Sequence, residues 1–251
     1  MAKASRMKFD FITIASHQLR TPLSAMKWFL EMLLSGSGGK LTRRQHDFIN
    51  EIYQSNERMI RLVNDLLIVS RIAQGTLKVV CRPFTLQTLL WGVMKELKPL
   101  TDAANITVVT KFDVTARTEI NGDEDKVRQV VRTILDNAIR YMIHGGLIIV
   151  KCVATLTSVT IQIQDTGVGI PAQERARVFQ QFYRGSNVVR MRTDGSGLGL
   201  YIAKAIVEAS RGTIGVSSAE GKGSLFSVTL PLDCAVPKKQ KIEKTKKQLI
   251  F

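Results

Sequence analysis

The sequence predicts a multidomain α and α+β protein, in which a helical hairpin precedes an α/β sandwich. Three observations predict this fold class: a helical spacing of apolar residues before Gly75, short strands and helices after it, and a length of 251 residues. One domain usually holds about 100–200 residues, so this length favours two domains. With 45% hydrophobic residues, the chain can bury a sizeable core.

The first helix is expected from about Ser5 to Leu34, where the segment Ser35-Gly-Ser-Gly-Gly39 ends it. Its apolar residues recur at helical spacing at Phe9, Ile12, Leu19, Leu23, Met26, Leu30 and Leu33.

A second helix is expected from Thr42, because the Thr42 hydroxyl and the Gln45 side chain have the spacing of a capping box. A heptad seam then runs through positions 45, 49, 52, 56, 59, 63, 66 and 70. Two helices cannot cover both of their apolar faces, and leaving roughly five large side chains exposed forfeits on the order of 10 kcal/mol. We therefore expect a homodimeric four-helix bundle, the alternative being a hairpin docked on the rest of its own chain.

After Gly75 the pattern predicts a sandwich with helices on one face of a sheet. Strands are expected at residues 76–81, 106–112, 147–153, 157–165, 213–218 and 224–230. Helices are expected at residues 86–97, 123–142 and 198–210.

The net charge of +15 would suit a nucleic-acid binder, but six lysines and one glutamate after Pro237 contribute +5 of it. We expect this lysine-rich tail to be a disordered extension, and we expect no specific nucleic-acid partner. Cys81, Cys152 and Cys234 are far apart and lack the spacing of a metal site, so ordinary reduced thiols are expected. Neither a membrane segment nor a secretory signal is visible, which favours a cytoplasmic location.

A lone histidine, His17, lies in the first helix five residues before Pro22. A proline inside a helix cannot donate to the carbonyl four residues earlier, and its ring pushes that carbonyl aside. The helix should therefore loosen beside His17. An exposed imidazole with a free ring nitrogen near neutral pH is a candidate nucleophile for a phosphoryl group.

Polar residues and glycines later in the chain suggest a nucleotide site. Thr133, Asn137, Arg140 and Tyr141 should share one helix face. The segments Asp165-Thr-Gly-Val-Gly169 and Gly195-Ser-Gly-Leu-Gly-Leu200 let the backbone approach a ligand closely, and the second leads into a helix whose N-terminus suits phosphate. Each glycine motif alone is a weak signal.

Taken together, these motifs resemble, in order and spacing, those of sensor histidine kinases of two-component systems, over residues from about 9 to 233. The resemblance implies a dimerisation and histidine phosphotransfer hairpin at residues 1–75 and a Bergerat-fold ATPase domain at 76–233. Residues 234–251 would be the basic tail.

The resemblance also implies roles in the hairpin. His17 would be the phosphoacceptor, and Thr21 would position water for dephosphorylating the partner. The family usually has an acidic residue after the histidine, where this chain has Gln18. An amide can orient the ring but cannot take up its proton, so slower or differently assisted transfer is expected.

In the ATPase domain, the resemblance implies that Asn137 ligates the magnesium ion bound to ATP and that Asp165 accepts a hydrogen bond from the adenine amino group. Thr133 stands where the family commonly has a second asparagine, so magnesium would be held less firmly. A mobile lid at residues 184–194 would supply phosphate-binding arginines, among them Arg190 and Arg192. The implied nucleotide-binding residues are Asn137, Arg140, Tyr141, Asp165, Gly167, Gly169, Phe179, Phe182, Arg184, Gly195, Gly197, Leu198, Gly199 and Leu200.

The implied reaction transfers the γ-phosphoryl group of ATP to His17 and then to an aspartate of a response-regulator receiver domain. One alternative is a dimeric nucleotide-binding scaffold without competent phosphotransfer. Another is a different ATPase of the same fold, such as a chaperone or a topoisomerase subunit, although the preceding hairpin disfavours it. The chain could also be the cytoplasmic part of a membrane-associated signalling system.

Overall fold

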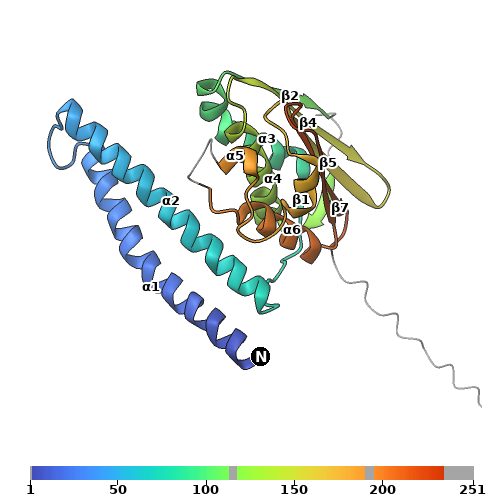
Figure 1. The fold of residues 1–251 in the computed structure, drawn as a ribbon, viewed down its shortest axis with the longest axis horizontal. Coiled ribbons are helices and arrows are strands. Elements are labelled where there is room, and N and C mark those ends of the chain that lie inside the picture. Colours follow the sequence, from blue (N-terminus) through green and yellow to red (C-terminus); the bar gives the residue numbers. More distant parts are fainter. Residues whose placement is uncertain (1, 113–117, 190–194, 235–251) are drawn as a thin grey trace, which may run out of the picture.

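The computed structural model describes residues 2–112, 118–189 and 195–234, with side chains from residue 14 onward. A helical hairpin lies beside a sheet domain, and the second helix of the hairpin faces that domain (Figure 1). The lysine-rich tail and the lid residues Arg190 and Arg192 lie outside the described residues.

The hairpin consists of α1 (Ala2–Leu34) and α2 (Arg43–Ala73). Helix α1 ends where the glycine-rich segment begins, and Gly36 takes a φ of +81° that favours glycine. The expected capping box is present at the start of α2. The Gln45 N–H donates to Thr42 Oγ1 at 3.3 Å, and the Thr42 N–H donates to Gln45 Oε1 at 2.9 Å.

Heptad spacing divides the hairpin into a covered face and an uncovered face. The covered face holds buried residues seven apart, namely Ser16, Leu23 and Leu30 on α1 and Asn56, Val63 and Ser70 on α2. The uncovered face holds exposed apolar residues at the same spacing, namely Leu19, Met26 and Leu33 on α1 and Ile52 and Met59 on α2. The single chain therefore covers only half of the predicted seam.

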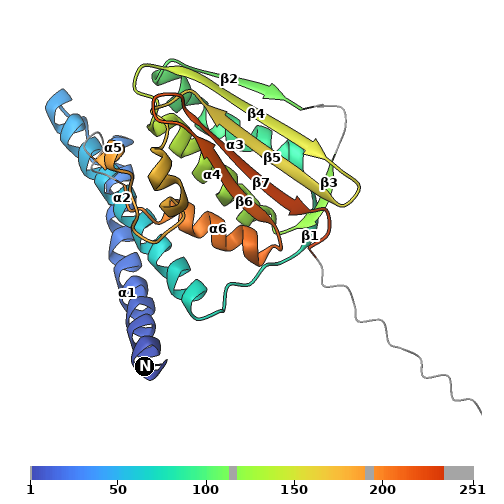
Figure 2. The same ribbon diagram turned by 45° about the vertical axis from the view of Figure 1, so that its right-hand side comes forward.

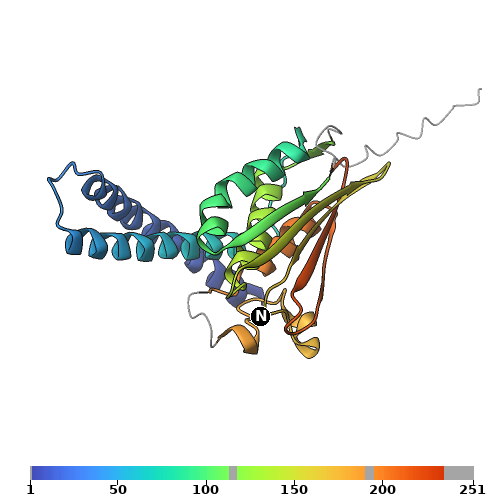
Figure 3. The same cartoon turned by 90° about the horizontal axis from the view of Figure 1, so that it is seen from above.

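The second domain is a five-stranded sheet in the order β2 (Ile106–Lys111), β4 (Gly146–Ala154), β5 (Ser158–Asp165), β7 (Ser224–Pro231) and β6 (Thr213–Ser218). Neighbouring strands are antiparallel except for β2 and β4, which are parallel. Helices α3 (Leu86–Ala103), α4 (Glu124–Arg140) and α6 (Gly199–Ala209) cover one face of this sheet (Figures 2 and 3). The predicted helix-on-sheet sandwich is confirmed.

The strand expected at residues 76–81 is wrong. The strand forms later, as β1 (Arg82–Thr85), and pairs with the unpredicted β3 (Glu119–Gly122) in a separate two-stranded sheet. The linker before β1 is instead held by a side chain, because the Val80 N–H donates to Asp123 Oδ2 at 2.9 Å. Two further short helices, η1 (Ala172–Arg177) and α5 (Ser186–Val189), lie between β5 and α6, where no helix was predicted.

The expectation of reduced thiols is also wrong for two of the three cysteines. Cys81 and Cys234 form a disulfide with a Cα–Cα distance of 6.2 Å, while Cys152 is a free thiol. The fold brings the two cysteines together through β3. Asn121 on that strand pairs with β1, and its carbonyl accepts a hydrogen bond from the Cys234 N–H at 2.9 Å.

In the described part of the chain, none of the helices combines the length and the apolarity needed to cross a membrane.

Candidate functional site

His17 is exposed on α1, as are its neighbours Gln18 and Thr21. Helix α1 continues through Pro22, so the proline does not end it. Ser16 is buried in the hairpin, and this fixes the rotation of the helix that turns His17 outward. An exposed imidazole on a packed helix is accessible to a second domain.

The turn that follows His17 is tied to α2. The Arg20 guanidinium donates to Asn64 Oδ1 at 2.8 Å. Three residues after Arg20 in α1, the Leu23 carbonyl accepts a buried hydrogen bond from Asn56 Nδ2 at 3.0 Å. Both contacts lie close to Pro22, where the helix has lost one of its own hydrogen bonds.

Helix α4 has the two faces that its sequence predicts. The apolar residues Val127, Val131, Ile134 and Ala138, which recur at helical spacing, are buried in the domain core. The expected polar stripe of Thr133, Asn137, Arg140 and Tyr141 is half-buried along one edge. Arg140 Nη2 lies 3.4 Å from Asp136 Oδ2, and Asp123 caps the start of the helix by accepting from the Lys126 N–H at 3.1 Å.

Asp165 ends β5 and is 7% exposed. Its Oδ1 accepts hydrogen bonds from the Gly167 N–H at 2.8 Å and the Ser224 N–H at 3.2 Å. Burial raises the pKa of this carboxyl, and the two backbone hydrogen bonds oppose the rise. Among the described residues both bonds reach Oδ1, which leaves Oδ2 for a donor on a ligand.

The two glycines after Asp165 are required by close backbone contacts. A Cβ on Gly167 would lie 2.7 Å from the Tyr141 carbonyl oxygen at the end of α4. Gly169 has a φ of +67°, and a Cβ there would overlap the Ala219 carbonyl. The loop after Asp165 therefore packs against the end of α4 and against the turn between β6 and β7.

The segment from Phe179 to Phe182 holds two phenylalanines that differ in their burial. Phe179 packs edge-on against Phe226 of the sheet, with 6.5 Å between ring centroids. Phe182, in contrast, is 62% exposed, so its side chain does not anchor the loop to the core. Its backbone does make contact, because a Cβ on Gly197 would lie 2.6 Å from the Phe182 carbonyl carbon.

The glycine-rich loop of residues 195–199 lies close to Arg184 and to Thr133 on α4. A Cβ on Gly195 would lie 3.3 Å from Arg184 Nε, and one on Gly199 would lie 3.1 Å from Thr133 Cγ2. Leu198 is fully buried and fixes the start of α6, while Leu200 packs against the core. The N-terminus of α6 thus faces the polar stripe of α4, where free N–H groups suit phosphate.

One residue near this loop was not predicted from the sequence. Asp65 on α2 lies near the Ser196 hydroxyl. Burial raises the pKa of Asp65 to about 6, while the Ser196 hydroxyl and the nearby Arg61 charge act to lower it. A second unpredicted contact holds α5, where Asn187 Nδ2 donates to the Gly169 carbonyl at 3.0 Å.

The donor set around Asn137 fits magnesium that is bound mainly through phosphate. The described residues contain no cluster of three carboxylate, imidazole or thiol groups that could enclose a metal ion. Magnesium usually keeps several waters and takes few protein oxygens when it is bound with a nucleotide. The half-buried Asn137 amide on the polar stripe can supply one such oxygen.

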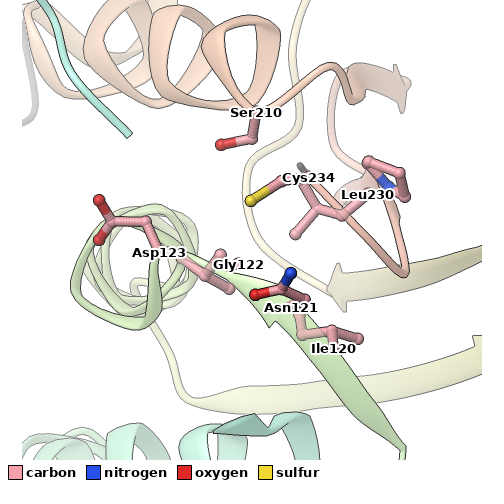
Figure 4. Close-up of a pocket in the computed structure, with 9 residues that line it drawn as sticks. Ile120, Asn121, Gly122, Asp123, Ser210, Leu230 and Cys234 are labelled. Atoms are coloured by element: carbon pink, nitrogen blue, oxygen red, sulfur yellow. The ribbon is translucent and has the colours of Figure 1, made fainter. Parts of the chain in front are cut away.

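A small pocket elsewhere in the domain is not this site (Figure 4). It is lined by Asn121, Asp123, Ser210, Leu230 and Cys234, among others. Asp123 and Ser210 lie at the ends of α4 and α6 opposite to those that carry Asn137 and Gly199, about 15–20 Å away along each helix axis. None of the predicted nucleotide-binding residues lines this pocket.

Two family models match the chain. His Kinase A (phospho-acceptor) domain matches residues 7–75, and the histidine kinase-, DNA gyrase B- and HSP90-like ATPase matches residues 122–234. Together they cover both the hairpin that carries His17 and the domain that carries the glycine motifs.

Relatives and solved structures agree with these matches. The chain is 32% identical to the circadian input-output histidine kinase CikA of Synechococcus elongatus, over 91% of this chain and 30% of that protein. It is 32% identical to the sensor protein GacS of Pseudomonas syringae, over 92% of this chain and 26% of that protein. The chain thus spans about a quarter to a third of these relatives.

Among solved structures, full-length ShkA in complex with AMPPNP matches with a TM-score of 0.72 and 26% identity, over 88% of this chain and 45% of that chain. The histidine kinase AdeS of Acinetobacter baumannii matches with a TM-score of 0.60 and 25% identity, over 86% of this chain and 98% of that chain. With a phospho-acceptor hairpin followed by the ATPase domain, the chain belongs to the histidine kinase family.

Proposed function

We propose that this chain is a protein-histidine kinase that transfers the γ-phosphoryl group of ATP to His17. The observation that supports this most strongly is the combination of an exposed His17 on a packed hairpin with the meeting of α4, the Asp165 loop and the N-terminus of α6. We assign residues 1–75 to phosphotransfer and residues 76–233 to ATP binding.

In the proposed reaction, an imidazole nitrogen of His17 attacks the γ-phosphorus as the bond to the ADP oxygen breaks. Gln18 can orient the ring by hydrogen bonding, and water takes up the displaced proton, since an amide cannot. Asp165 Oδ2 accepts from the adenine amino group, while the N–H groups at Gly199 and the charge of Arg184 face the phosphates. Magnesium held through Asn137 would offset charge on the phosphate oxygens.

We propose a homodimer and a response-regulator receiver domain as partners. The uncovered hairpin face supports the dimer, because a second copy would bury Ile52 and Met59, which are 55% and 44% exposed. Phosphohistidine would pass its phosphoryl group to a regulator aspartate, and Thr21 would position water for hydrolysis of that aspartyl phosphate to aspartate and inorganic phosphate. We place this reaction in the cytoplasm, where ATP is available.

A nucleotide-binding scaffold without phosphotransfer is the second candidate. Gln18 favours it because the family's usual proton acceptor is missing, and Thr133 favours it because its methyl group, not an amide oxygen, faces Gly199.

The test is incubation of purified protein with γ-labelled ATP and magnesium, beside His17→Ala. We expect label that is stable to alkali, labile to acid and absent from the variant. Wild-type protein that binds ATP yet acquires no label, even with added regulators, would establish the scaffold instead.

A further inference from the structure

Helix η1 holds the start of α5 through a single carboxylate. Glu174 on η1 accepts two hydrogen bonds from Ser186, the first residue of α5. The Ser186 N–H donates to Glu174 Oε2 at 3.0 Å, and the Ser186 hydroxyl donates to Glu174 Oε1 at 2.5 Å. These hydrogen bonds lower the pKa of the Glu174 carboxyl, which is therefore ionised at neutral pH. Both oxygens of one side chain thus bind the same residue.

Helix η1 is itself fixed to the domain. Phe179, which follows η1 closely, packs against Phe226 of β7. Residues three apart in a 3₁₀ helix lie on one face, so Arg177 should share the face of Glu174. The Arg177 guanidinium carbon lies 4.6 Å from the centroid of the Tyr183 ring. Two side chains of η1 therefore hold the chain just before α5 and at its first residue.

The next residue of α5 extends this contact to the loop after Asp165. Asn187 Nδ2 donates to the Gly169 carbonyl at 3.0 Å. Gly185 leaves room for the side chains on either side, since a Cβ there would lie 3.0 Å from Asn187 Oδ1 and 3.1 Å from Glu174 Oε2. Glu174 and Asn187 therefore both pack over Gly185, and α5 is fixed to the loop that follows the proposed adenine-binding carboxylate.

The same segment also contacts the glycine-rich phosphate loop before α6. A Cβ on Gly197 would lie 2.9 Å from the Tyr183 carbonyl oxygen, and one on Gly195 would lie 3.3 Å from Arg184 Nε. Residues 182–189, which we call the brace, therefore contact the loop after β5 at one end and the phosphate loop at the other.

We propose that Glu174 is a positioning residue for ATP, which fixes the brace so that the loop after Asp165 and the phosphate loop stand at the separation that one nucleotide spans. This inference rests on the proposed kinase function, since it takes the two loops as the adenine and phosphate sites. Glu174 acts through Ser186 and Asn187 and need not touch ATP. A ligand that must contact both loops binds more weakly when their spacing is not fixed in advance.

The test measures the affinity of the purified full chain for the ATP analogue AMPPNP with magnesium, by calorimetry. We expect Glu174→Ala to weaken binding by about three- to tenfold, because it removes both hydrogen bonds to Ser186. Glu174→Gln should retain affinity within about twofold, since its amide oxygen can accept from the Ser186 N–H and its amide nitrogen can donate to the Ser186 hydroxyl. Glu208→Ala, which removes an exposed carboxylate near the end of α6, is the matched control and should bind as wild type does.

Further variants test whether the effect runs through this contact. Ser186→Ala removes only the hydroxyl hydrogen bond, so it should weaken binding less than Glu174→Ala does. The double variant should bind no more weakly than Glu174→Ala alone, because both changes act on one contact. Asn187→Ala, which removes the hydrogen bond to Gly169, should also weaken binding.

Autophosphorylation kinetics distinguish positioning of ATP from a role in the chemical step. For Glu174→Ala we expect the KM for ATP to rise by about three- to tenfold, while the maximal rate at saturating ATP stays within about twofold of wild type. Unchanged affinity in Glu174→Ala would overturn the proposal. So would a loss in Glu174→Gln as large as in Glu174→Ala, or a lower maximal rate at unchanged KM.

Wild-type protein separates this proposal from the proposed function. A wild type that does not bind AMPPNP contradicts the nucleotide site and overturns the positioning role with it. A wild type that binds the analogue but acquires no label from ATP contradicts the kinase reaction alone, and the affinities of the variants still decide the role of Glu174.

Discussion

At Asp165 a single buried carboxylate divides its two oxygens between structure and recognition. Oδ1 accepts the Gly167 and Ser224 N–H groups and so fixes the loop to β7. Oδ2 is left for a ligand donor among the described residues. The division explains why a carboxylate, with acceptors on both oxygens, suits this position better than an amide.

Replacing Asp165 with Asn should separate these two tasks. The amide oxygen can still accept from both N–H groups, but the amide nitrogen would present a donor to the adenine amino group. We expect ATP affinity to fall by about 10–100-fold, measured by calorimetry, while the thermal midpoint changes little. Glu220→Gln, an exposed carboxylate change in the β6–β7 turn, is the control and should leave affinity unchanged.

Gly169 provides a prediction about stability at the neighbouring backbone. Because its φ is +67° and a Cβ would overlap the Ala219 carbonyl, Gly169→Ala should lower the free energy of unfolding by about 2–4 kcal/mol. Urea denaturation measures this. Gly215→Ala on β6 is the matched control, since a Cβ there meets nothing within 4 Å. Equal effects of the two changes would contradict the close contact.

At the scale of elements, a hydrogen bond and a disulfide join the linker between α2 and β1 to later parts of the ATPase domain. Val80 is held by the Asp123 carboxylate that also caps α4, and Cys81 is joined to Cys234 after β7. The disulfide therefore closes a loop that contains the whole sheet. Closing so long a loop removes much conformational entropy from the unfolded chain.

Reducing this disulfide should lower the free energy of unfolding by about 2–5 kcal/mol, as measured by urea denaturation with and without reductant. Cys81→Ser should reproduce the loss, whereas Cys152→Ser should leave the difference between oxidised and reduced protein intact. Because disulfides are rare in reducing compartments, the free thiols should also be counted in protein trapped directly from cells. Three reactive thiols in denatured, unreduced protein would contradict the bond.

Reactivity of Cys152 offers a check in the same experiment. Burial raises the pKa of the Cys152 thiol to about 11, so little thiolate is present in the folded protein at pH 8. We expect an alkylating reagent to modify Cys152 only slowly before unfolding and readily afterwards.

For the whole molecule, the uncovered heptad face of the hairpin determines assembly. Leu19, Met26 and Leu33 continue along α1 beside Ile52 and Met59 on α2, and all five are exposed in the single chain. Burying such side chains is worth about 1.5–3 kcal/mol each, which favours a dimer through this face.

Placing charge on this face should therefore produce monomers. We expect Ile52→Glu combined with Met59→Glu to shift the mass measured by light scattering from twice 28.0 kDa to 28.0 kDa. Asn50→Glu combined with Gln54→Glu, on the opposite side of α2, is the charge-matched control and should remain dimeric. Circular dichroism checks that the helices persist. A dimer that survives the apolar-face change would place the interface elsewhere.

The local features of this fold could be predicted from the sequence because short-range rules control them. The Thr42 cap, the polar face of α4 and the strands β4 and β5 depend on neighbouring residues and on periodicity, and each formed as expected. The misplaced first strand shows the limit of such rules. Residues 76–81 have strand-like composition, but the pairing partner β3 lies elsewhere and selects residues 82–85.

By itself, the sequence determined the order of the two domains, the family resemblance and the identity of His17, Asn137, Asp165 and the glycine loop, because these depend on residue type and spacing. Only the tertiary structure decided which distant residues meet. The Cys81–Cys234 bond, the exposed side chain of Phe182 and the proximity of Asp65 and Ser196 all depend on how the domains pack. Packing brings together residues that are far apart in the chain, and local residue spacing does not predict such contacts.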